Sequence, residues 1–311
     1  MDTAGFFTQA RVLIVAGKGG VGKTTVAATL AQMAAAAGLR ALIVEIEGKS
    51  GLGNAFGESD ALDYEERELA PGVRARTVTP DFALIEYLEE HGLRRVSKRL
   101  AKTGALEVVS SAIPGIKDIL VLGKVKALAR DDAADVIIVD APAAGHAITF
   151  LASARGLLDA VRVGPIVEQA RDVDAMLSDA ARCQVVLVTL PEETPVNEAI
   201  ETAFGLEDRV GIKLGPLVVN GVYPVMDLDV AEIDAAGLDS RDADALRAAA
   251  DFRIHRQQLQ ASQLARLKEA LPLPQIVLPQ LFTSAIGPNE ITELADAMRK
   301  EVEQLPRGVA T

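Results

Sequence analysis

The chain has very few of the side chains that build redox centres or soft-metal sites. Its 311 residues include one cysteine, three histidines and no tryptophan. The lone Cys183 cannot form an internal disulfide, and it begins the apolar run Cys-Gln-Val-Val-Leu-Val, which is typical of a buried strand. We therefore expect Cys183 to be a buried structural thiol, in a protein of the reducing cytoplasm.

Positive charge and long hydrophobic runs are also scarce. The chain has 32 lysines and arginines against 44 acidic residues, a formal net charge of −12, and such a surface repels nucleic-acid phosphate and anionic lipid. No apolar stretch reaches the roughly 18 residues that a membrane span needs. The start, Met-Asp-Thr-Ala-Gly, lacks the apolar run of a signal peptide. These absences predict a cytoplasmic protein that binds no nucleic acid.

The most informative feature that is present is the run Gly-Lys-Gly-Gly-Val-Gly-Lys-Thr-Thr at 17–25, which fits the consensus G-x-x-x-x-G-K-[ST]. A strand pattern precedes it and a helix pattern follows it. Glycines let backbone N–H groups point at phosphates, and a helix N-terminus adds positive potential. We predict that Lys23 reaches the β/γ-phosphates of ATP and that the Thr24 hydroxyl binds Mg²⁺. The other predicted phosphate contacts are Gly17, Gly19, Gly20, Val21, Gly22 and Thr25.

Short apolar runs separated by helical patterns predict an α/β fold. The alternation indicates a mostly parallel sheet flanked by helices on both faces. The predicted strands lie at 11–16, 41–46, 135–140, 183–190, 215–220 and 274–278.

Strand signals stop between residues 80 and 130, where leucine, isoleucine and valine recur at helical spacing. We interpret residues 1–311 as one domain, with a helical subdomain inserted at about 81–130 and 160–182. The alternative is that these helices simply pack on the sheet. The helices expected here and later in the chain lie at 81–90, 92–102, 105–112, 116–130, 165–180 and 241–269.

A second motif that suits a nucleotide site is the run Asp-Val-Ile-Ile-Val-Asp-Ala-Pro-Ala-Ala-Gly-His at 135–146. A buried strand that ends in a carboxylate is the companion of a Mg·ATP site. We therefore predict that Asp140 holds Mg²⁺ and that the Gly145 backbone N–H faces the γ-phosphate. The second strand ends in Val-Glu-Ile-Glu, where a carboxylate could orient the attacking water. The residues alone leave open that Glu45 or Glu47 has this role, or that both are plain surface residues.

Together these motifs resemble the deviant Walker A ATPases, with Lys18 in the signature position. The run at 140–146 is similar to the Asp-Thr-Ala-Pro-Thr-Gly-His switch II of one branch. That branch holds the bacterial arsenite-pump ATPase and the Get-pathway ATPase that targets tail-anchored membrane proteins. Switch I, Glu-Gly-Lys-Ser-Gly-Leu at 47–52, is similar to that of actinobacterial proteins described as anion-transporting ATPases. Further matches, which extend the resemblance over residues 11–300, lie at 113–118, 189–193, 218–224 and 278–281.

The resemblance implies a SIMIBI-type P-loop fold and a Mg·ATP-dependent switch ATPase. The enzyme would work as a face-to-face dimer, of two copies or with a paralogous subunit, and would couple ATP to a membrane-protein client or membrane partner. The resemblance also implies that Lys18 crosses the interface to the phosphates of the facing subunit. Glu47 falls without gaps on the family's water-orienting aspartate. The residues that it places against adenine are Asn220, Pro279, Gln280 and Leu281.

The departures from the family pattern exclude some of its ligands. The chain lacks the C-x-x-C that binds zinc in the targeting ATPase and the three cysteines that bind arsenite in the pump ATPase. Because soft ligands need thiolates, we expect neither zinc nor arsenite here.

The longer carboxylate at position 47 leaves open a weakly hydrolysing, nucleotide-binding partner subunit of a heterodimer. A Min/Par-type positioning ATPase and an enzyme that transfers phosphate to a small molecule would also use a phosphate loop. The mostly acidic last helix, at 289–303, disfavours the membrane-binding form of a positioning ATPase.

Overall fold

The computed structural model describes residues 1–46, 51–95, 97, 99, 115–132, 134–228, 230–235 and 239–306. Its strands are β1 (Val12–Gly17), β2 (Ala41–Ile46), β3 (Arg67–Ala70), β4 (Val73–Val78), β5 (Val136–Ala143), β6 (Cys183–Thr189), β7 (Lys213–Leu214), β8 (Leu217–Val222) and β9 (Gln275–Pro279). Its helices are α1 (Thr3–Phe7), α2 (Lys23–Ala36), α3 (Gly51–Ala55), α4 (Pro80–Glu90), α7 (Ile116–Arg130), α8 (Ala144–Ala160), α9 (Pro165–Leu177), α10 (Glu193–Val210), α11 (Val230–Ala235), α12 (Ser240–Ala270) and α13 (Pro288–Gln304).

Within the described residues, all of these strands join one nine-stranded sheet of order β3-β4-β2-β5-β1-β6-β8-β9, with β7 beside β6. The pairs are parallel except β3–β4, which is antiparallel. The predicted mostly parallel α/β fold is confirmed, and each of the six predicted strands is present within about three residues at either end. The connection after β1 leads to β2 on one side and that after β6 leads to β8 on the other. This switch point, at the carboxyl ends of β1 and β6, is where open α/β sheets bind ligands.

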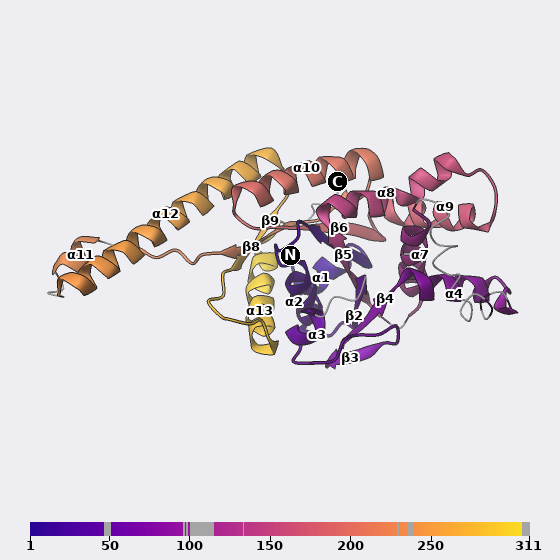
Figure 1. Cartoon of the computed structure of the whole chain (residues 1–311), viewed down its shortest axis with the longest axis horizontal. Coiled ribbons are helices and arrows are strands. Elements are labelled where there is room, and N and C mark those ends of the chain that lie inside the picture. The colour runs from indigo at the N-terminus through magenta and orange to yellow at the C-terminus, as the bar shows by residue number, and fades with distance from the viewer. Residues whose placement is uncertain are drawn as a thin grey trace.

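Both faces of the sheet are covered by helices (Figure 1). The position of strand β1 in the middle of the sheet explains why its residues are almost all apolar. Its even-numbered residues Val12, Ile14 and Ala16 join a core with α7, α8 and α10. Leu13 and Val15 point to the other face, into a core with α2 and α13. Such a strand is buried on both sides, so it reads as a continuous hydrophobic run.

The helices that were predicted between the strands are confirmed where the structure describes them. Helix α4 matches 81–90, α7 matches 116–130 and α9 matches 165–180 except for its last turn. The helix expected at 105–112, and residues 96, 98 and 100–102 of that expected at 92–102, lie outside the described residues. Helices α7 and α8 contribute to the sheet's own core, while α7 also packs against α4 and α9.

Helix α12, predicted at 241–269, is confirmed and leaves the body of the molecule (Figure 1). It spans 31 residues, a length of about 46 Å at the rise of an α-helix. Helix α11 lies at its outer end, on the side opposite to α4 and α9. Within the part of the chain that the structure describes, every helix is too short or too polar to cross a bilayer.

Candidate nucleotide site

The phosphate loop lies between β1 and α2, and its glycines allow a close approach of neighbouring elements. A Cβ on Gly17 would lie 2.3 Å from the Val188 carbonyl oxygen on β6. Gly22, which caps the N-terminus of α2, has a φ of 92° in the left-handed region that favours glycine. Because α2 then begins at Lys23, the first backbone N–H groups of the helix face the loop. The chain therefore builds an anion-binding helix terminus at the switch point.

The side chain of Asn220 holds this loop from β8. Its Nδ2 donates a 3.0 Å hydrogen bond to the Val21 carbonyl oxygen. The same nitrogen lies 2.3 Å from the position that a Cβ on Gly22 would take. Asn220, expected to contact adenine, is thus within reach of the loop itself and couples β8 to it.

The two lysines of the loop have different surroundings. Lys23 is only 7% exposed, and its Nζ donates a 3.0 Å hydrogen bond to the Lys18 carbonyl oxygen. Lys18 is about a third exposed, and its Nζ lies 2.5 Å from Glu198 Oε1 on α10. Lys23 is therefore buried within the loop, while Lys18 extends from the loop toward α10 of the same chain.

Thr24 and Asp140 come together from elements that lie 116 residues apart in sequence. The Thr24 hydroxyl donates a 2.6 Å hydrogen bond to Asp140 Oδ2, and Asp140 is fully buried at the carboxyl end of β5. A hydroxyl and a carboxylate beside a phosphate cradle are the oxygen donors that Mg²⁺ prefers. These two residues therefore fit the metal that the sequence predicts.

Of the two glutamates that the sequence offers, the structure describes only Glu45, because Glu47 lies outside the described residues. Glu45 is 1% exposed, and its Oε2 accepts a 3.0 Å hydrogen bond from the Thr77 hydroxyl on β4. It pairs in register with Asp140 on β5. Its position inside the sheet suits a structural role between β4 and β5 better than contact with a mobile water.

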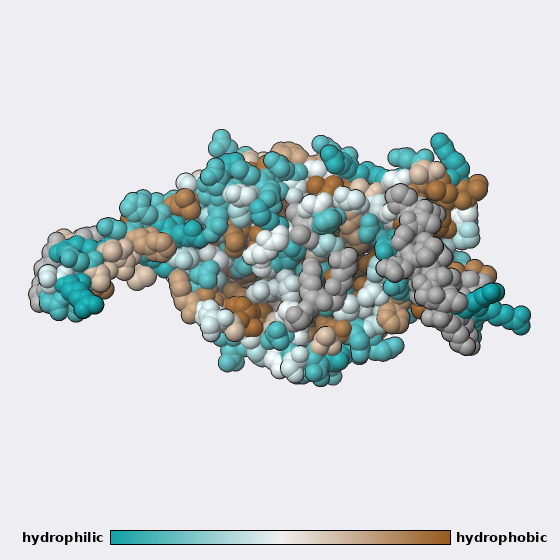
Figure 2. Space-filling view, in the orientation of Figure 1, coloured by the Kyte–Doolittle hydropathy of each residue, from teal (hydrophilic) through white to brown (hydrophobic). Residues whose placement is uncertain are grey.

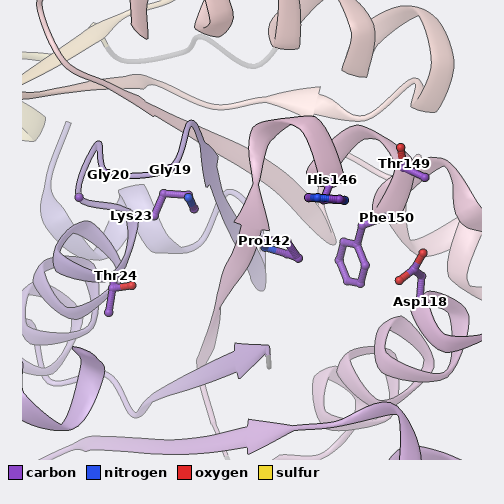
Figure 3. A pocket seen from close by; sticks show the side chains of 10 residues that line it. Gly19, Gly20, Lys23, Thr24, Asp118, Pro142, His146, Thr149 and Phe150 are labelled. Atoms are coloured by element: carbon purple, nitrogen blue, oxygen red, sulfur yellow. The ribbon is translucent and has the colours of Figure 1, made fainter. Parts of the chain in front are cut away.

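A cavity of about 680 Å³ opens beside the phosphate loop (Figure 3). Loop residues Gly19, Gly20, Lys23 and Thr24 lie on one side, and a second wall faces them across Pro142. That second wall is formed by Asp118 on α7 and by His146, Thr149 and Phe150 on α8. The cavity thus extends from the phosphate loop toward helices α7 and α8, and both of these helices contribute polar residues to it.

Gly22 also lines this cavity, whereas Gly145, Asn220 and residues 279–281 do not. Gly145 is exposed in the first turn of α8, one residue before His146. Pro279 ends β9 opposite Val222 of β8. Gln280 donates its backbone N–H to the Val222 carbonyl oxygen at 2.8 Å, which fixes the loop that leads to Leu281. Pro279 and Asn220 thus lie on adjacent strands, and Gln280 and Leu281 follow directly after β9.

Sequence reasoning missed several residues that the fold brings to the site. Asp118, Thr149 and Phe150 line the cavity, and Glu198 pairs with Lys18. The motif at 113–118 and the Pro-Glu helix opening near 191–198 were visible as matches to known sequences. Asp118 and Glu198 lie near the phosphate loop because of how α7 and α10 pack, and no local sequence pattern encodes this packing.

A mostly parallel sheet covered on both faces, a glycine loop at its switch point and a threonine–aspartate pair beside that loop define a P-loop NTPase. The chain belongs to the anion-transporting ATPase family, whose sequence profile matches residues 10–163. The ATPase BagA of Mycobacterium tuberculosis is 30% identical to it over 94% of this chain and 93% of that protein.

Two further relatives are more distant. The arsenical pump-driving ATPase of Escherichia coli is 27% identical over 75% of this chain, which spans 43% of that protein. The ATPase get3 of Schizosaccharomyces japonicus is 28% identical over 52% of each chain. The resemblance read from the motifs is confirmed, and the protein is an ATP hydrolase of this family.

Proposed function

We propose that this ATPase is a Mg·ATP-dependent switch that closes as a face-to-face dimer, either of two copies or with a paralogous subunit. The observation that carries the proposal is the 2.6 Å contact between Thr24 and the buried Asp140, beside a buried Lys23. It joins the two nucleotide motifs of the sequence in one site. The geometry of the loop supports a triphosphate ligand, because its backbone and a lysine converge on one anion site.

Each residue then has one task in the reaction. Lys23 neutralises the β/γ-phosphates, and Thr24 and Asp140 hold Mg²⁺, which when bound lowers the charge that develops on the phosphates. Glu47 orients the attacking water, while Glu45 stays bonded to Thr77. The backbone N–H of Gly145 binds the γ-phosphate. The remaining phosphate contacts are Gly17, Gly19, Gly20, Val21, Gly22 and Thr25.

The adenine base lies over the edge formed by β8 and β9. Asn220 contacts the base there, and it also holds the loop through Val21. The peptide run from Pro279 to Leu281 forms the other side of the base site. Since Asn220 touches both the loop and the base, it links correct base recognition to phosphate positioning.

Lys18 acts across the dimer interface on the phosphates of the facing subunit, as an arginine finger does. In the single chain its Nζ pairs with Glu198, so the lysine must exchange this partner when the dimer closes. Both side chains are about a third exposed, and a pair so exposed is worth about 0–1 kcal/mol. Breaking the pair with Glu198 therefore costs less free energy than a contact between Lys18 and phosphate contributes.

The helical segments at 81–130 and 160–182 form the inserted subdomain that engages the client or membrane partner. They move with the nucleotide because α7 and α8 supply the far wall of the cavity. A change in the γ-phosphate region is thereby transmitted to α4 and α9, which pack on α7.

The test is the affinity of Lys23→Ala for Mg·ATP, measured by isothermal titration calorimetry. Loss of a charge-assisted phosphate contact costs about 1.5–3 kcal/mol, so the affinity should fall roughly 10- to 150-fold. Lys300→Ala, which removes an exposed lysine on α13, is the matched control and should bind as the wild type does. Equal affinities of wild type and Lys23→Ala would remove the assignment of the phosphate site.

A further inference from the structure

The long helix α12 is held to the rest of the chain mainly through the face that carries Gln257 and Gln260, and near its inner end Arg266 also donates to Asn197 on α10. Its Gln257 bonds both ways to the backbone of Met226, accepting from N at 2.8 Å and donating to O at 3.1 Å. Its buried Gln260 joins the Tyr223 N–H and the Gly221 carbonyl in the same manner. We call α11, α12 and the segment 223–228 the arm. These bonds cover the face of α12 that looks toward residues 221–226.

Another face of α12 is apolar and exposed. Phe252 is 66% exposed and Leu259 is 43% exposed. Ala245 and Ala249 are exposed as well. Ala245, Phe252 and Leu259 recur every seven residues and Ala249 lies between the first two, so they share one stripe along the helix. Figure 2 shows hydrophobic residues among the hydrophilic ones along the arm.

A seven-residue apolar period is the spacing by which two helices pack side by side. Placed on a 31-residue helix that leaves the body of the molecule, such a stripe marks an interaction surface. The period also suits a partner that is itself a long helix.

The distribution of charge along α12 indicates which long helix would fit as the partner. Residues 239–251, the outer half, carry four aspartates and two arginines. Residues 252–270, the inner half, carry four lysine or arginine side chains and one glutamate. The outer half is therefore net negative and the inner half net positive. A second copy that lies antiparallel would place each negative half against a positive half, whereas a parallel copy would place like charges together.

We propose that the arms of two copies of this chain pair antiparallel along the stripe, and that they do so without nucleotide. The register that brings Asp242 of one copy opposite Arg266 of the other also brings Ala249 opposite Leu259. A two-fold axis then relates the copies, and every contact occurs twice. The pairing does not depend on the proposed phosphate site.

Sedimentation velocity of the nucleotide-free protein tests the pairing. The wild type should sediment at twice the chain mass of 32.8 kDa, and the double variant Phe252→Asp/Leu259→Asp at the single chain mass. Val163→Asp changes a residue that is 82% exposed just before α9, and this control should remain dimeric. Far-UV circular dichroism checks that the double variant keeps its helix content. A monomeric wild type, or a double variant that still dimerises, would overturn the proposal.

Disulfide trapping tests the direction and register separately. Ala249→Cys/Leu259→Cys should form a covalent dimer, while each single variant should not. Ten residues along one helix separate these positions by about 15 Å, beyond the roughly 7 Å that a disulfide can span, so the bond cannot close within a chain. The native Cys183 is fully buried and does not compete. Trapping by either single variant would indicate parallel arms, and a double variant that traps only with a different protein would also contradict pairing between copies.

Discussion

Gly17 sets how closely the phosphate loop approaches β6. A methyl group there would meet the Val188 carbonyl oxygen at 2.3 Å, and because this atom is backbone it cannot rotate away. Gly17→Ala should therefore lower the free energy of unfolding by about 1–3 kcal/mol through overpacking. Urea unfolding followed by circular dichroism measures the change.

Gly156→Ala is the matched control for this substitution. Gly156 lies within α8, is exposed, and has no atom within 4 Å of an added Cβ. Alanine is favoured over glycine in a helix, so this change should raise stability by about 0.5–1 kcal/mol. The two substitutions should thus have opposite signs. A neutral or stabilising Gly17→Ala would show that β1 and β6 can separate without cost.

Asp135 and Arg40 form an ion pair at the amino ends of β5 and β2. Side-chain and backbone hydrogen bonds from Arg40 lower the pKa of Asp135 from an ordinary value near 3.8 to about 2. The Arg40 backbone N–H and its Nη2 each donate to this carboxylate at 2.7 Å. A lowered carboxyl pKa means that the folded state favours the ionised form. The pair therefore stabilises the fold above about pH 4 and loses this contribution as the pH falls toward 2.

Asp135→Asn should accordingly reduce the free energy of unfolding near neutral pH, and the difference from wild type should shrink between pH 4 and 2. The side chain of Asp135 is 35% exposed, so solvent screening limits the effect to about 0.5–1 kcal/mol. Urea unfolding at a series of pH values measures it. Asp132→Asn removes a fully exposed carboxylate 3.9 Å from Arg40 and should change little at any pH. A pH-independent difference for Asp135→Asn would contradict the ionic origin.

Among the elements, those with a local signal were predictable from the sequence. The strand, glycine loop and helix around Lys23 form one continuous motif, and buried strands such as β1 and β6 are almost entirely apolar. Strand β3 was missed because it has only four residues, two of them charged, and β4 because Arg74 and Arg76 interrupt its apolar run. They become strands because β4 pairs with β2 along its whole length, a long-range contact that overrides local propensity.

Contacts between distant elements could not be predicted. The Lys18–Glu198 pair needs α10 to lie over the loop. Similarly, the Tyr64 hydroxyl donates to Glu86 on α4, which in turn binds Lys124 on α7 at 2.6 Å. Burial and this bond to Glu86 raise the pKa of Tyr64. Each of these partners is an ordinary charged or polar residue in sequence, and only the packing of the helices brings them together.

Helix α7 connects the cavity to the neighbouring helices. Its Asp118 lines the cavity, its Lys124 binds Glu86 on α4, and its Lys126 binds Asp172 on α9 at 2.9 Å. Lys126 is only 6% exposed whereas Asp172 is about half exposed, so this contact lies at the edge of the packed interior. A displacement of α7 at the cavity must therefore move α4 and α9, or break these ion pairs.

Hydrogen exchange with and without a non-hydrolysable ATP analogue tests this coupling in the segments 81–130 and 160–182. Their exchange should slow about fivefold or more, which corresponds to a coupling free energy of about 1 kcal/mol. Helix α13 packs on the opposite face of the sheet and serves as the internal reference. Identical protection of α4, α7 and α9 in both states would reduce these helices to a static covering of the sheet.

At the scale of the whole molecule, the two candidate interaction regions lie at opposite ends. The arm extends to one side of the sheet and α4 and α9 lie at the other, with the phosphate loop between them (Figure 1). A dimer that pairs through the arm, as proposed, would leave the far helices uncovered. Closure at the phosphate loop is a separate proposed contact. The order in which these contacts form decides whether nucleotide assembles the dimer or only closes it.

Subunit mixing tests whether the active site is shared between two chains. Lys18→Ala should bind ATP nearly as the wild type does and lose turnover on the order of 10³-fold, as removal of a trans-acting arginine finger does. Glu47→Gln should also bind ATP and turn it over slowly. An equal mixture should recover roughly a quarter of wild-type turnover, because half of the dimers are mixed and each of these holds one complete site.

Two outcomes of this experiment would contradict an active site shared between two copies, and they have different meanings. Full activity of Lys18→Ala alone would show that the lysine is not used across the interface and that its cis pair with Glu198 is its whole role. Inactive single variants whose mixture stays inactive, but which regain turnover with a paralogous subunit, would show that the complementary site belongs to another chain. The variant Glu198→Gln tests whether Glu198 competes with the phosphates of the facing subunit for Lys18 or is only a passive partner of this lysine. If Glu198 only withholds Lys18 from the facing phosphates, its removal leaves ATP affinity unchanged and raises turnover at low protein concentration, where closure of the dimer limits the rate.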